Sequence, residues 1–157
     1  MTAVLRKGGV AMQAVEDVRL VTSEEFVTDL VCQLKLSHFE QVKLADTFED
    51  KRFARAYEML VENQDRFGLA VDFSLATNPY HGDSSTLREA IYALRDRHIV
   101  AINNPRLKTV EFKVDEDDAN YYLDHSSIPR TLMAKIVEEV FGTDPAPDDE
   151  RRNTGRH

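Results

Sequence analysis

The first clear pattern along the chain is a helical repeat of apolar residues that begins after residue 22. Thr22 and Glu25 have the spacing of a capping box, in which each side chain bonds the other residue's backbone N–H group. The apolar stripe that follows consists of Phe26, Val27, Leu30, Val31 and Leu34. The pattern therefore predicts a helix that begins near residue 23 and buries one face.

Two more apolar repeats predict that helices continue towards residue 67. Ser37 and Glu40 repeat the capping spacing and predict a second helix. Its inward stripe would be Phe39, Val42, Ala45 and Phe48, and a third helix would bury Phe53, Ala56, Tyr57, Leu60 and Phe67. Gly68 predicts the end of the third helix, because glycine is common just past a helix end.

Alternation of apolar and polar positions replaces the helical period at residue 69. Every second residue from Leu69 to Leu75 is large and apolar, which is typical of a strand with one buried face. A shorter apolar segment at Val18–Val21 predicts another strand. These are the only extended segments that the pattern predicts before residue 84.

The stretch from Ser84 to Val114 combines a helix with a two-stranded ribbon. Its helical stripe consists of Leu87, Ala90, Ile91 and Leu94. A β-branched run at Ile99–Ile102 and an alternating segment at Val110–Val114 predict two strands. Asn103–Arg106 joins them with residues that favour a turn.

This order of helix, step and ribbon resembles the recognition helix and wing of a winged helix. The resemblance implies contact with duplex DNA, by the helix in the major groove and by the ribbon tip on the backbone or minor groove. The residues that it places at DNA are Arg88, Tyr92 and Arg95, with Ser85, on the helix, and Arg106 and Lys108 on the ribbon. One departure stands out: the strand at Leu69–Leu75 leads straight into this helix, where a winged helix has another helix.

The end of the chain adds two predicted helices and a tail. The acidic run Asp115–Asp118 suits the positive start of a helix at about 117–123. Ser127 predicts a cap for the last helix, with Pro129 in its first turn and Gly142 at its end. The stripe of this helix is Leu132, Met133, Ile136, Val137 and Val140.

The sequence as a whole predicts a mostly helical α+β fold with a small antiparallel sheet of three strands. We expect a flexible arm at 1–16, one globular domain at 17–142 and a disordered tail at 143–157. The three strands would be Leu69–Leu75 and the ribbon. Besides the winged helix, the pattern also fits a plain three-stranded sheet covered by helices from both ends of the chain.

Composition and charge limit the classes of binding partner and the compartment that we expect. The 157 residues carry a net charge of −8, which argues against general affinity for nucleic acid, although the stretch from Ser84 to Val114 is net positive. Cys32 is the single cysteine and falls on an apolar helix face, so we expect a buried, inert thiol in a reducing compartment. With no apolar run of membrane-spanning length, a cytoplasmic protein without membrane contact is expected.

Catalytic and metal-binding patterns give little support for an enzyme. The five histidines lack the spacing of a helical metal site, and we expect no metal or other cofactor. His125 next to Ser126 and Ser127 could suggest a nucleophile with its base, but serines that cap the last helix explain the same residues. A small hydrolase that uses His81 or His125 is the least favoured interpretation.

Two non-enzymatic functions remain. The first is a winged-helix-type DNA-binding or regulatory domain. The second is a protein-interaction adaptor, a homodimer or a small subunit of a larger bacterial-type assembly, without contact to nucleic acid. The net positive charge of the helix and ribbon favours the first.

Overall fold

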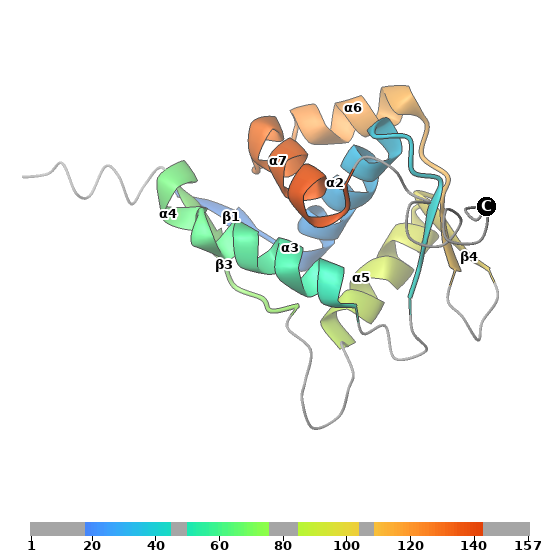
Figure 1. Ribbon diagram of the computed structural model, residues 1–157, viewed down its shortest axis with the longest axis horizontal. Coiled ribbons are helices and arrows are strands. Elements are labelled where there is room, and N and C mark those ends of the chain that lie inside the picture. Colours follow the sequence, from blue (N-terminus) through green and yellow to red (C-terminus); the bar gives the residue numbers. More distant parts are fainter. Residues whose placement is uncertain (1–17, 45–49, 76–84, 104–108, 143–157) are drawn as a thin grey trace, which may run out of the picture.

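The computed structural model describes residues 18–44, 50–75, 85–103 and 109–142 (Figure 1). The helices in these ranges are α2 (Ser23–Leu36), α3 (Lys51–Glu62), α4 (Gln64–Phe67), α5 (Ser85–Asp96), α6 (Glu116–Asp124) and α7 (Arg130–Val140). The strands are β1 (Arg19–Val21), β2 (Gln41–Lys43), β3 (Leu69–Val71), β4 (Val100–Asn103) and β5 (Thr109–Phe112). The predicted arm at 1–16 and tail at 143–157 lie outside the described residues.

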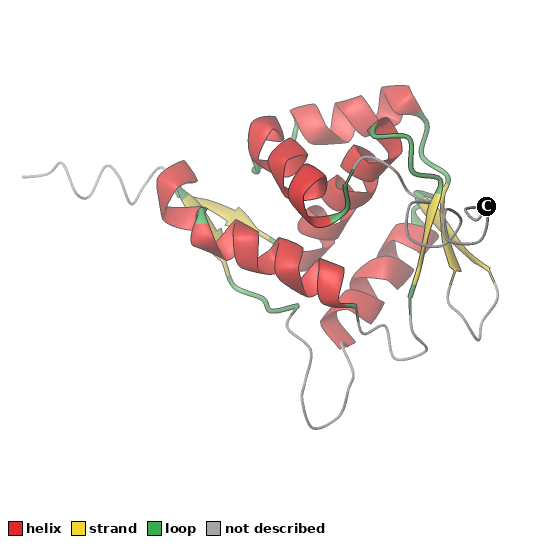
Figure 2. Ribbon diagram, viewed as in Figure 1, coloured by secondary structure: helices red, strands yellow, loops and turns green. Residues whose placement is uncertain are grey.

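Helix α2 is the centre of the core. Every residue from Phe26 to Cys32 is buried, because α5, α6 and α7 all pack against this helix. Its start is the predicted one: the Thr22 side chain accepts a hydrogen bond from the Glu25 N–H group at 3.1 Å. The helices form the body of the molecule, and two small sheets lie at its opposite ends (Figure 2).

The larger sheet is antiparallel, has three strands and runs in the order β2-β5-β4. The α+β class with a small three-stranded sheet is therefore confirmed, but the predicted identity of the third strand is wrong. That strand is Gln41–Lys43, within the segment for which the sequence predicts a second helix. Val42 is buried between exposed neighbours, so the segment follows a period of two, and Ser37 is the C-cap of α2 instead of a new N-cap.

The smaller sheet pairs β1 with β3 in parallel, and Leu20 lies opposite Ala70. The predicted short strand at Val18–Val21 is confirmed by β1. The predicted strand at Leu69–Leu75 is confirmed only as far as Val71, and it belongs to this second sheet.

The correction brings the element order closer to that of a winged helix. The succession α2, β2, α3, α5, β4, β5 is helix, strand, helix, helix, strand, strand. In the winged-helix order, a helix should lie between the first strand and the recognition helix. That helix is α3, because the first strand is β2 and not β3. Helix α4 and strand β3 then form an insertion before α5. Helix α4 ends at Gly68, which has a left-handed backbone with φ of 67°.

The start of α7 differs from the prediction. Its N-cap is Pro129, which has no side-chain hydrogen bond to offer, so the predicted cap by Ser127 is wrong. The Ser127 N–H group instead donates to a carboxylate oxygen of Glu25 on α2 at 2.8 Å. The serines next to α7 therefore connect two helices that are far apart in sequence.

Histidines end two of the core helices in the left-handed region that usually belongs to glycine. After α2, His38 has φ of 75°, and the Phe39 N–H group reaches back to the Leu34 carbonyl at 3.0 Å. After α5, His98 has φ of 65°, and Ile99 makes the same bond to Leu94 at 2.9 Å. This is the Schellman arrangement, which buries the next apolar residue and turns the chain towards a strand.

Because a side chain in the left-handed region is strained, His38→Gly is expected to stabilise the fold. We expect the free energy of unfolding to rise by about 1 kcal/mol in urea titrations. The neighbouring Ser37→Gly is the control: Ser37 has φ of −90°, so glycine there only adds flexibility to the unfolded chain and lowers stability. A loss of stability in His38→Gly would contradict this account of the helix end.

Candidate functional site

Of the six residues that the sequence places at DNA, Ser85, Arg88, Tyr92 and Arg95 lie on α5. Arg88, Tyr92 and Arg95 are separated by four and then three positions, which aligns them along a helix. The Arg95 guanidinium lies 4.6 Å from the centre of the Tyr92 ring. Arg95 is exposed, whereas Arg88 and Tyr92 are partly buried. The other two residues, Arg106 and Lys108, lie outside the described residues.

The positive charge of the stretch from Ser84 to Val114 is divided between different partners. Arg95 forms an ion pair with Asp96 at 3.2 Å, and Lys113 forms one with Glu111 at 3.1 Å. Arg97 turns towards α2 and α6, away from the stripe of Arg88 and Arg95. The described residues therefore do not combine all these cations into one surface.

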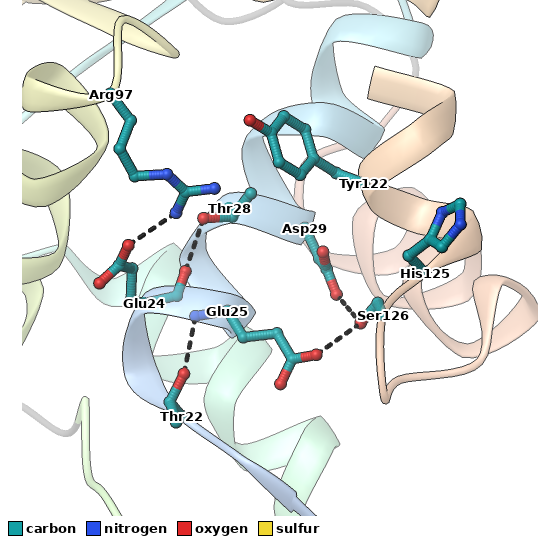
Figure 3. A pocket seen from close by; sticks show the side chains of 9 residues that line it. All are labelled: Thr22, Glu24, Glu25, Thr28, Asp29, Arg97, Tyr122, His125 and Ser126. Carbon is teal, nitrogen blue, oxygen red and sulfur yellow. Dashed lines mark hydrogen bonds and ion pairs between the residues drawn. The ribbon is translucent and has the colours of Figure 1, made fainter. Parts of the chain in front are cut away.

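A pocket with a volume of about 240 Å³ lies where the start of α2 meets the end of α6 and the residue that follows α5 (Figure 3). The residues that line it are all of polar or charged types. The lining residues are Thr22, Glu24, Glu25, Thr28, Asp29, Arg97, Tyr122, His125 and Ser126. Of these, the sequence singled out only His125 and Ser126 as candidates for chemistry.

One side of the pocket is a cluster of two carboxyl groups and a serine. The Ser126 hydroxyl forms a hydrogen bond with Asp29 Oδ2 and lies 3.3 Å from Glu25 Oε2. Its oxygen also accepts a hydrogen bond from the Ile128 N–H group at 2.9 Å. Asp29 and Glu25 are one helical turn apart on α2, so one face of this helix holds the turn before α7 (Figure 3).

Burial dominates the electrostatics of Asp29, whose relative exposure is 1%. Loss of solvent raises the pKa of Asp29 to about 8, the hydrogen bond from Ser126 opposes this shift, and the negative charge of Glu25 adds to it. The same helix holds Cys32, and burial raises the pKa of this thiol to about 12, with a smaller contribution from Asp29. The prediction of a buried Cys32 is confirmed, and the raised pKa keeps the thiol protonated and unreactive.

The opposite side of the pocket is an ion pair on an aromatic ring. Arg97 donates to Glu24 Oε2 at 2.6 Å, and its guanidinium lies 5.3 Å from the centre of the Tyr122 ring. Arg97 thus connects the residue after α5 with the first turn of α2 and with α6. Both charged side chains remain partly exposed, so solvent screens the pair.

His125 and Ser126 form hydrogen bonds with different groups in this pocket. His125 Nδ1 lies 2.8 Å from the Tyr121 carbonyl oxygen, and its ring stacks on the Tyr121 ring at 4.1 Å. Ser126 is engaged with carboxylates and a backbone N–H group. His81 lies outside the described residues. Within those residues, no group of three or more histidine, cysteine or acidic side chains is placed to hold a metal ion.

The sequence contains a signal for this cluster that periodicity alone does not reveal. Asp29 interrupts an apolar run between Thr28 and Leu30 on a helix that other helices surround. A charged group in such a run needs a partner, because an unpaired buried charge costs several kcal/mol. The partner, Ser126, is distant in sequence and follows a different pattern, so spacing could not identify it.

Comparisons with protein-family models, curated proteins and solved structures find no match for the chain. Among the helices of the described ranges, none has the length and apolar character to span a membrane.

We expect the contact between Arg97 and Glu24 to show a coupling energy of at most about 1 kcal/mol in a double-mutant cycle of Arg97→Ala and Glu24→Ala. Salt should reduce this coupling, because both side chains are partly exposed. Arg97→Ala should cost more stability than Glu24→Ala, since it also removes the contact with the Tyr122 ring. Strict additivity at low salt in urea titrations would contradict the ion pair.

Proposed function

We propose that this chain is a non-enzymatic domain of the winged-helix type that binds duplex DNA through α5. The observation that carries the proposal is the succession α2, β2, α3, α5, β4, β5, in which α5 has the place of the recognition helix. The stripe of Arg88, Tyr92 and Arg95 supports it, because a helix in the major groove needs cationic and polar side chains along one face.

The ion pair of Arg95 is compatible with this function. The side chains of Arg95 and Asp96 are 49% and 71% exposed, and such surface pairs contribute little to stability. A phosphate oxygen can therefore replace Asp96 at the guanidinium at small cost. The overall charge of −8 confines the binding surface to α5 and the ribbon, so binding should be weak on other faces and sensitive to salt.

We expect binding of a fluorescent duplex, measured by anisotropy at low salt, to weaken about tenfold in Arg95→Glu and in Arg106→Glu. Each variant should also reduce the slope of log affinity against log salt concentration by about one. Lys135→Glu is the control, because this exposed lysine lies on α7 and its replacement changes the net charge equally. Absence of binding by the unchanged protein, or equal weakening in Lys135→Glu, would refute the DNA-binding proposal.

A second candidate function, that of a protein-interaction module without nucleic-acid contact, rests on a different observation. Leu20 on β1 is 54% exposed and Val18 next to it is 43% exposed. Leu20 belongs to a parallel sheet that has two strands in the described part of the chain, whereas parallel sheets are normally larger and covered on both faces. A second copy of the chain that pairs along β1 would cover these side chains and extend the sheet.

We expect, on this second proposal, that light scattering shows a dimer and that Leu20→Glu shifts it to the monomer. Tyr121→Glu is the matched control, because Tyr121 is 58% exposed on a different element, α6. A strict monomer at every concentration tested, or a dimer that Leu20→Glu leaves intact, would exclude self-association through β1.

A further inference from the structure

We propose that Glu25, Asp29 and Ser126 form a proton-dependent latch, which holds the turn before α7 against α2 only while the two carboxyl groups share one proton. The latch consists of these three residues and of the two backbone N–H groups that bind them, from Ser127 and Ile128. It lies at the wall of the pocket and does not depend on the proposed DNA-binding function.

The number of hydrogen atoms in the cluster is the first argument. The Ser126 hydroxyl has one hydrogen, yet it faces carboxyl oxygens of both Asp29 and Glu25. With Asp29 protonated, its O–H group donates to Ser126 Oγ, and the Ser126 O–H group donates to Glu25 Oε2. The Ser127 N–H group supplies the second hydrogen bond of Glu25 Oε2. One added proton therefore gives every contact a hydrogen, whereas without it Ser126 can donate to only one of the two carboxylates that it faces.

The surroundings of Asp29 are the second argument. The charged and titratable groups around it include Glu24, Glu25 and Cys32 on α2, Arg97 after α5, Asp118 and Tyr122 on α6 and His125 after α6. The cation among them, Arg97, is bound to Glu24. His125 is exposed and directs its Nδ1 to the Tyr121 carbonyl. Arg97, the cation among these described neighbours, is thus already paired. A negative charge on Asp29, next to that of Glu25, would not be balanced by it.

The direction of the pH effect follows from these two arguments. A free aspartic acid releases its proton near pH 4, while burial keeps Asp29 protonated to about pH 8 in the folded chain. Between these values the folded chain binds one more proton than the unfolded chain. Stability therefore falls as pH rises through this window, and the loss is complete above the folded-state pKa.

Release of the latch has a defined structural result. When Asp29 ionises, two carboxylates compete for the Ser126 hydroxyl, and their repulsion favours withdrawal of the turn that contains Ser126. The Ser127 and Ile128 N–H groups then lose their acceptors and become open to solvent. This movement enlarges the pocket between α2 and the end of α6.

The test is a ¹³C-detected NMR titration of the intact chain, with Asp29 assigned through its backbone and the carboxyl resonances followed from acid to alkaline pH. We expect the Asp29 carboxyl to titrate near pH 8 and the amide exchange of Ser127 and Ile128 to accelerate with the same midpoint, beyond the general base dependence seen in neighbouring helix amides. An Asp29 carboxyl that titrates near pH 4, or amides whose exchange ignores its midpoint, would overturn the proposal.

Two variants test the pH dependence of folding stability independently of the NMR titration. Asp29→Asn retains a donor to Ser126 but cannot ionise, so its stability should not fall between about pH 5 and pH 8 as that of the unchanged chain does. Relative to this variant, the folding equilibrium constant of the unchanged chain should drop about tenfold per pH unit in the window. Asp65→Asn on α4 is the control for an aspartate outside the core. Equal pH profiles for the unchanged chain and Asp29→Asn would contradict the latch, and the NMR titration decides if Asp29→Asn fails to fold.

Discussion

The burial of α2 on nearly all sides is the constraint on which the rest of the structure depends. Helices α5, α6 and α7 surround it, so a helix with one apolar stripe must also place polar residues in the interior. The buried Thr28 hydroxyl donates a hydrogen bond to the Glu24 carbonyl of the same helix at 2.7 Å. Asp29 has no such local partner and takes Ser126 from the other end of the domain. The packing of the core therefore creates the polar pocket, because the buried acid fixes where the turn before α7 must lie.

The charge distribution decides between the functions only in part. Arg88 and Arg95 align along one face of α5. Arg97, which follows on the same segment, contacts Glu24 and the Tyr122 ring at the pocket. A DNA-binding surface would thus be narrow and would need the residues between β4 and β5. The exposed Leu20 belongs to β1, and the sheet of β1 and β3 lies at the other end of the body from β4 (Figure 1).

Local patterns predicted the elements well where one face alone is buried. The stripes of α3, α5 and α7 and the cap at Thr22 are clear in the sequence, as is the stop at Gly68. The prediction of a helix directly after α2 was wrong, because the capping spacing of Ser37 and Glu40 also fits a helix end followed by a strand. Three residues of strand, as in β2, are too few to reveal a period of two. The partners of β1 and β3 could not be deduced, since pairing depends on the packing of the whole chain.

The candidate site was less predictable than the fold for a physical reason. The α5 stripe follows from helical spacing, so Arg88, Tyr92 and Arg95 could be aligned from the sequence. The pocket instead depends on contacts between α2 and residues after α6, which no spacing rule connects. Ser126 and Ser127 were assigned to the nearest helix, because local capping is the common use of serine next to a helix. Their actual partners are acidic residues about a hundred positions earlier.

The parallel pairing of β1 with β3 has a consequence for the order in which the chain folds. Arg19 pairs with Leu69, and such nonlocal pairing carries a larger loop-closure entropy than a hairpin does. The hairpin of β4 and β5, by contrast, joins neighbours in sequence and forms quickly. The β2–β5 ladder, from Gln41 to Glu111, closes a longer loop still, so β1 and β2 both pair later than the hairpin, and β1 presents an unpaired edge until β3 is in place. An intermediate with that strand free would be the species most prone to aggregate at high concentration.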